Sequence, residues 1–166
     1  EYLWNESWSD EPVLSDIRTK VLWKKIISND KFLSAQGIFS PQDITNTAYD
    51  AYSIIKEYCF TLPKDDISLT EETQALKRWI KSYEKELSSL GFIDKLSLKE
   101  RLIKLIKDRK IPLPEDIILA GFDEITPKTL LFIDRLKVSG TKITFWPSEL
   151  ITNYTTADIP DMTGCI

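Results

Sequence analysis

Histidine is absent from the 166 residues of this sequence, and cysteine occurs only twice. The lack of histidine excludes Ser-His and Cys-His nucleophilic pairs, histidine general bases and histidine metal ligands. The two cysteines, Cys59 and Cys165, lie far apart in the chain. We expect Cys59 to be a buried free thiol within a helix, which favours a reducing, cytoplasmic compartment.

Long apolar runs and an excess of positive charge are absent as well. No stretch approaches the roughly 20 apolar residues that a membrane span needs, so we expect no membrane partner. The chain has 22 Lys and Arg residues against 26 Asp and Glu residues, a net charge of −4, so a contact with DNA requires a local basic face. No secretory signal is visible, and the first residue is Glu1 rather than Met, which suggests an excised or processed polypeptide.

Four helices are predicted in the first two thirds of the chain. Their first residues are of the types that cap helices, namely Ser15, Ser40, Thr70 and Ser97. The last of them opens a capping box, Ser97-Leu98-Lys99-Glu100, in which the serine and the glutamate satisfy each other's backbone donors. We therefore expect a helical domain over residues 15–111, preceded by an extended N-terminal segment over residues 1–14.

Apolar residues recur at helical spacing in these segments. In the first helix, Ile17, Val21 and Trp23 are predicted to belong to one broad face toward the core. In the third helix, Trp79 and Tyr83 lie on the most regular apolar stripe of the chain. The aromatic residues are interpreted as core residues, and stacking on nucleic-acid bases is the alternative.

A strand, a helix and a second strand are predicted over residues 112–147. Ile117–Leu119 is typical of a buried strand, Thr126-Pro127 begins a helix, and Lys142–Trp146 alternates as a second strand. Strands joined through a helix are expected to be parallel. The predicted fold class is therefore mainly α with a small parallel βαβ unit.

Two parallel strands are too few for a stable sheet that is covered on both faces. We expect the sheet to be completed by chain outside this sequence, by the N-terminal segment, or by a second copy. The stretch over residues 148–166 is polar and without period, and we predict a loosely attached tail there.

Two carboxylates follow the first predicted strand. Asp123 and Glu124 lie at its carboxyl end, where open parallel sheets bind ligands. One interpretation is a site where Asp123 binds magnesium through water and Glu124 orients an attacking water. The alternative is an ordinary strand–helix turn, where the helix dipole favours acids. No Gly-rich phosphate loop ending in Lys-Ser or Lys-Thr occurs in this chain, and such an acid pair hydrolyses no nucleotide without one.

A basic face is predicted on the fourth helix. Its candidates for contacts with DNA phosphates are Lys99, Lys104, Lys107, Arg109 and Lys110. The alternative is a solvated helix face whose cations are favoured near the C-terminal end.

Three segments resemble a block of the AddB-like DNA-repair proteins of bacteria, namely Leu22–Ile27, Arg78–Asp94 and Pro114–Leu136. Gly91–Asp94 matches a Gly-hydrophobic-Ile-Asp turn of that family, and Gly121–Pro127 matches its Gly-Phe-Asp-Glu-Leu-Thr-Pro motif. These proteins are similar to superfamily-one helicases of the UvrD type and usually end in a PD-(D/E)XK nuclease domain.

The resemblance covers about residues 14–147 and implies an internal fragment. It implies a helical accessory domain between helicase motifs I and II, followed by the part of a helicase-like core that carries motif II. In UvrD-type helicases the Asp-Glu pair of motif II continues with Gln and Asp, whereas Thr126 and Pro127 follow it here. This departure implies a degenerate motif.

The function implied by the resemblance is a scaffolding or contact role in double-strand-break repair or recombination. The fragment itself is expected to hold no cofactor and to catalyse nothing. The full-length protein is expected to bind DNA, ATP and magnesium as an ATP-dependent helicase or exonuclease, with an AddA-type helicase subunit as partner. Two alternatives are a stand-alone helical interaction module and a metal-dependent phosphohydrolase that uses Asp123 and Glu124.

Overall fold

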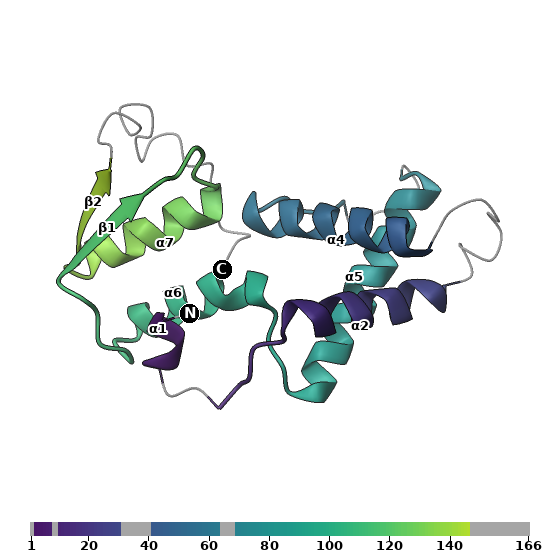
Figure 1. Cartoon of the computed structure of the whole chain (residues 1–166), viewed down its shortest axis with the longest axis horizontal. Coiled ribbons are helices and arrows are strands. Elements are labelled where there is room, and N and C mark those ends of the chain that lie inside the picture. Colours follow the sequence, from purple (N-terminus) through teal and green to yellow (C-terminus); the bar gives the residue numbers. More distant parts are fainter. Residues whose placement is uncertain (1, 8–9, 31–40, 64–68, 147–166) are drawn as a thin grey trace. The chain divides into compact units, whose positions relative to one another are not determined.

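Figure 1 shows the computed structural model of the chain, which describes residues 2–7, 10–30, 41–63 and 69–146. The fold is mainly helical with a small two-stranded parallel sheet, and the predicted fold class is confirmed. The chain divides into two compact units. Among the described residues, the helical unit comprises 11–30, 41–56, 60–63 and 69–96, and the α/β unit comprises 2–7, 10, 57–59 and 97–146. The predicted tail over residues 148–166 lies outside the described residues.

The helical unit is built from α2 (Asp16–Ser28), α4 (Pro41–Glu57) and α5 (Glu71–Leu90). Two of the predicted caps are confirmed, because the side chain of Ser15 accepts from the backbone N–H of Arg18 and that of Thr70 from Thr73. At the other end of α5, Gly91 adopts a left-handed conformation with φ 68°. Glycine reaches this conformation without a Cβ clash, so the helix ends where the sequence predicts.

The core of the helical unit centres on three aromatic rings, one from each helix. The ring centroid of Trp23 lies 5.0 Å from that of Tyr83 and 5.4 Å from that of Tyr52, and the two tyrosine rings lie 5.7 Å apart. None of the three side chains is more than 1% exposed, and Trp79 is 5% exposed. The interpretation as core residues is confirmed, and stacking of these rings on bases is excluded by their burial.

One prediction for the first helix is wrong. Ile17 and Val21 are 78% and 63% exposed rather than buried. The helix advances about 100° per residue, so Val21 points almost opposite to Trp23, and the buried tryptophan decides which side faces the core. The inward side of α2 therefore carries Thr19, Leu22, Trp23 and Ile27.

The α/β unit contains the predicted strand–helix–strand segment. Its elements are α1 (Tyr2–Asn5), α6 (Leu98–Lys107), β1 (Asp116–Ala120), α7 (Pro127–Val138) and β2 (Lys142–Trp146), and a single 3-10 turn, Lys95–Ser97, leads into α6. The strands are parallel, with Ile118 opposite Thr144. Figure 1 shows α7 along one face of the sheet and α6 beside α7.

The two strands are not buried on both faces. Residues of each strand alternate between half-buried and exposed, and Ile118 and Trp146 on the outer face are each 71% exposed. The expectation of a buried strand at Ile117–Leu119 is therefore right for one face only. Completion of the sheet by the N-terminal segment is also wrong for the described residues. Tyr2–Asn5 forms a short helix instead, which packs against α6 and buries Trp4.

The capping box at the start of α6 is wrong. Ser97 is in a right-handed helical conformation and makes no capping hydrogen bond, because the 3-10 turn already precedes the helix. Asp94 satisfies the start of that turn instead, since its Oδ1 accepts from the backbone N–H of Leu96 at 3.1 Å. The carboxylate of Glu100, which the predicted capping box would have used, pairs with Lys128 of α7 instead.

The expectation for Cys59 is also wrong. The helix α4 ends at Glu57, and Cys59 follows in a left-handed conformation with φ 57°, so that the N–H of Phe60 reaches the carbonyl of Ile55 at 3.0 Å. Cys59 is half-buried and disulfide-bonded, and the other cysteine, Cys165, lies outside the described residues. The inference of a reducing compartment loses its support, because disulfides persist mainly in oxidising ones.

None of the helices in the described ranges is long and apolar enough to cross a bilayer.

Substitution of Trp23 by alanine should lower the free energy of unfolding by about 3–5 kcal/mol, because it removes the ring on which the other two pack. Ile17→Ser on the same helix should change it by less than about 0.5 kcal/mol, because that side chain is already in solvent. Urea unfolding followed by circular dichroism measures both. A larger loss for Ile17→Ser than for Trp23→Ala would contradict this description of α2.

Candidate functional site

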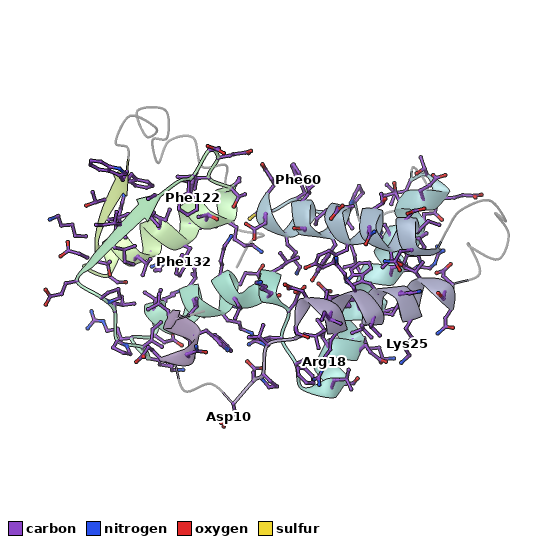
Figure 2. All side chains as sticks on the ribbon, in the orientation of Figure 1. Asp10, Arg18, Lys25, Phe60, Phe122 and Phe132 are labelled. Atoms are coloured by element: carbon purple, nitrogen blue, oxygen red, sulfur yellow. The ribbon has the colours of Figure 1, made fainter. Side chains whose placement is uncertain are left out.

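Asp123 and Glu124 lie on the turn between β1 and α7. Gly121, with φ 72°, begins this turn, and both acids are exposed to solvent. Figure 2 labels Phe122, which lies beside them at the start of α7. The carboxylate of Glu124 accepts a hydrogen bond from the hydroxyl of Tyr58. Within the described part of the chain, no group of three or more potential metal-ligating residues exists, so the two acids have no further protein ligands around them.

The end of α4 supplies a carboxylate to the N-terminus of α7. Thr126 caps α7, and its hydroxyl donates to Oε2 of Glu57 at 2.7 Å. Pro127 occupies the first turn, as predicted. Unpaired N–H groups and the helix dipole make a helix N-terminus favourable for an anion. Glu57 therefore stands where an external anion, such as a phosphate, would be favoured.

Two lysines pair with carboxylates near the start of α7, Lys99 with Glu57 and Lys128 with Glu100. The Nζ of Lys99 donates to Oε2 of Glu57 at 2.6 Å and to the hydroxyl of Thr129 at 2.8 Å. The Nζ of Lys128 lies 2.6 Å from Oε1 of Glu100, and Lys128 is only 1% exposed. These groups form what we call the α7 polar cluster, made of Glu57, Tyr58, Lys99, Glu100, Glu124, Thr126, Lys128 and Thr129.

Each charged group of the α7 polar cluster has a polar partner within the cluster. Each of its two ammonium groups lies against one carboxylate, and the capping hydroxyl is shared between Glu57 and α7. A buried charge without a partner is strongly unfavourable, which makes Glu100 necessary once Lys128 is buried. The geometry therefore holds α6, α7 and residues 57–59 in place, and offers no unpaired nucleophile or base.

The basic candidates of the fourth helix divide into two groups. The ammonium group of Lys99 points into the α7 polar cluster, whereas Lys104, Lys107, Arg109 and Lys110 are exposed. Lys110 lies 3.2 Å from Asp108, an ion pair in which both side chains are more than half exposed. Contact of these four cations with DNA phosphates stays a prediction.

Asp94, the last residue of the Gly91–Asp94 turn, is buried in the helical unit at 2% exposure. Its neighbour Ile93 bonds to the extended segment beside it, accepting from the N–H of Leu14 at 2.9 Å. Burial, and after it the Asp94 carboxylate, raise the pKa of Tyr49 to about 12 and hold the pKa of Tyr52 well above its ordinary value. This turn is thus part of the core of the helical unit.

The contacts of the α7 polar cluster were not predicted. Its partners lie 28, 42 and 69 residues apart in the sequence, and no local pattern links them. The sequence holds a partial signal at Lys128, which follows Pro127 on a helix whose neighbouring turns are apolar. A lysine that is buried at this position needs an acidic partner, but helical periodicity does not identify which acidic residue that is.

Glu57→Gln should lower the free energy of unfolding by about 1–2 kcal/mol, because it leaves the half-buried ammonium of Lys99 without a charged partner. Asp116→Asn removes an ion pair between Asp116 and Lys142, in which both side chains are more than half exposed. It should lower the free energy of unfolding by less than about 0.5 kcal/mol. Urea unfolding of both variants makes the comparison. Equal effects would contradict the role assigned to Glu57.

The helical unit should lose stability at alkaline pH. The pKa values of the core tyrosines are raised on folding, so their stabilisation is complete below pH 10 and is lost as the pH rises through about 12, the value for Tyr49. Tyrosinate absorbance, recorded alongside circular dichroism, should show Tyr49, Tyr52 and Tyr83 ionising only as the unit unfolds. Their ionisation near pH 10 in a chain that remains folded would contradict this.

Comparison with known proteins leaves the family open. No protein-family profile matches this chain, and no curated protein and no solved structure matches it either. The resemblance to AddB-like proteins therefore stays a prediction based on the quoted motifs.

Proposed function

We propose that this chain is a non-catalytic part of an AddB-like protein of DNA repair or recombination, and that it acts there as a scaffold. The observation that carries this proposal is the surroundings of the acid pair at the end of β1, namely its exposure and its hydrogen-bond partner. Asp123 and Glu124 are exposed, and Glu124 is hydrogen-bonded to Tyr58. Glu57 and two lysines occupy the adjoining helix N-terminus. A nucleotide-hydrolysing site of this kind holds its phosphate and magnesium with a Gly-rich phosphate loop as well, and this chain contains no such loop.

The departure from the helicase motif has a physical counterpart. Thr126 and Pro127 replace the Gln and Asp that continue motif II in UvrD-type helicases. Here they cap α7 and form its first turn. The two positions that follow the acid pair are thus used to begin a helix, which supports a degenerate motif.

The scaffold would work within a larger protein. The uncovered outer face of the sheet supports this, because parallel strands are normally covered on both sides. DNA, ATP and magnesium would be bound by the full-length protein, with an AddA-type helicase subunit as its partner. The exposed cations Lys104, Lys107, Arg109 and Lys110 are the candidates of this chain for the DNA path.

The purified chain should show no magnesium-dependent ATPase or nuclease activity above that of a matched Asp123→Asn/Glu124→Gln variant. Release of phosphate and cleavage of labelled DNA measure the two activities. Turnover that the double substitution abolishes would overturn the proposal in favour of a metal-dependent phosphohydrolase.

The family assignment has its own test in the gene. A phosphate loop upstream and a PD-(D/E)XK pattern downstream in the same reading frame would support an AddB-like protein. A reading frame without either would favour a stand-alone helical interaction module.

A further inference from the structure

The outer side of α2 carries two large aliphatic side chains in solvent. Ile17 and Val21 are 78% and 63% exposed and lie one helical turn apart. One exposed aliphatic residue is ordinary on a protein surface. Two at positions i and i+4 form a short stripe that the core of the helical unit does not use.

Positive charge lines this stripe on both sides. At about 100° per residue, Lys20 lies along one edge and Arg18 and Lys25 lie along the other, while Lys24 continues the line of the stripe one turn beyond Val21. All four are exposed, and Figure 2 labels Arg18 and Lys25 on α2. The one acid of the helix, Asp16, lies at its first turn and is 3.6 Å from Lys95.

This arrangement matches one side of a helix–helix seam. If Ile17 is a d position of a heptad, Val21 is the following a position and Lys24 the next d position, while Arg18, Lys20 and Lys25 fall at the flanking e and g positions. Residues at e and g choose the partner helix by charge, and three cations there favour a partner with acids.

We propose that the outer side of α2 docks an acidic amphipathic helix of another protein. Apolar side chains of that helix would cover Ile17 and Val21, and its carboxylates would meet the flanking cations. This inference is independent of the proposed function, since it rests on the exposed face of one helix.

The cations around the stripe differ in whether they already have a partner. Lys25 is 2.9 Å from Glu86 of α5, and the guanidinium of Arg18 lies 6.0 Å above the ring of Phe92. Lys20 and Lys24 are exposed and have no ion-pair partner among the residues that the structure describes. The carboxylates of the partner should therefore act mainly on Lys20 and Lys24.

The chemistry of the face favours a protein helix over other anionic partners. Helices that bind membrane surfaces bury a wide apolar face, often with aromatic anchors, whereas this stripe has two aliphatic side chains and no aromatic residue. Binding to nucleic-acid phosphates uses cations and gains nothing from an aliphatic centre.

The test uses two fluorescein-labelled synthetic helices with leucine at a and d, one with glutamate and the other with lysine at e and g. Fluorescence anisotropy should show the acidic peptide binding at least about tenfold more tightly than the basic one. The double variant Lys20→Glu/Lys24→Glu should reverse this preference, and Ile17→Ser/Val21→Ser should weaken binding of the acidic peptide by about tenfold or more.

Ile54→Ser is the matched control, because Ile54 is 52% exposed on α4 of the same unit, and it should leave binding unchanged. Circular dichroism and urea unfolding would establish that every variant is folded. Equal binding of the two peptides, or unchanged binding by Ile17→Ser/Val21→Ser, would overturn the inference. The inference would also be overturned if phosphatidylserine vesicles or duplex DNA bound as tightly as the acidic peptide and if Ile17→Ser/Val21→Ser weakened that binding.

Discussion

The carboxylate of Glu57 at the N-terminus of α7 determines what the acid-bearing turn can do. It accepts from the capping hydroxyl of Thr126 and from the ammonium group of Lys99, and so fills the position that the helix dipole makes favourable for an anion. An external phosphate would have to displace a charge that already has two strong donors. Asp123 and Glu124 stand beside this helix without a third metal-ligating residue near them among the described residues.

The parts of the fold that the sequence predicts are those set by neighbouring residues. The caps at Ser15, Thr70 and Thr126 and the helix stop at Gly91 depend on contacts within a few residues, and each is present. The predicted capping box at Ser97 does not form, because Asp94, three residues earlier, caps a 3-10 turn that includes Ser97. Both the capping box and the 3-10 turn are compatible with the local sequence, which does not determine which of them forms.

The missed features depend on contacts far along the chain. A period of 3.6 residues indicates that α2 has an apolar side, but Ile17 and Val21 are as apolar as the residues that are buried. The rings of Tyr52 and Tyr83 from the other two helices pack on Trp23, and this contact turns the Trp23 side of α2 inward. The α7 polar cluster was missed for the same reason, because a buried lysine requires an acidic partner but its sequence neighbours do not identify which acid that is.

Each unit, taken by itself, leaves apolar surface in solvent. The outer face of the sheet exposes Ile118 and Trp146, and the outer side of α2 exposes Ile17 and Val21. Burial of a large aliphatic or aromatic side chain is worth about 1.5–3 kcal/mol, which neither unit gains at these positions. A domain selected only for its own stability has little reason to keep them, whereas a scaffold that meets partners through these surfaces does. Within the described residues the acid pair has no further metal-ligating neighbours, which agrees with the proposed scaffold role, since a scaffold would use the turn that carries the acids and not their chemistry.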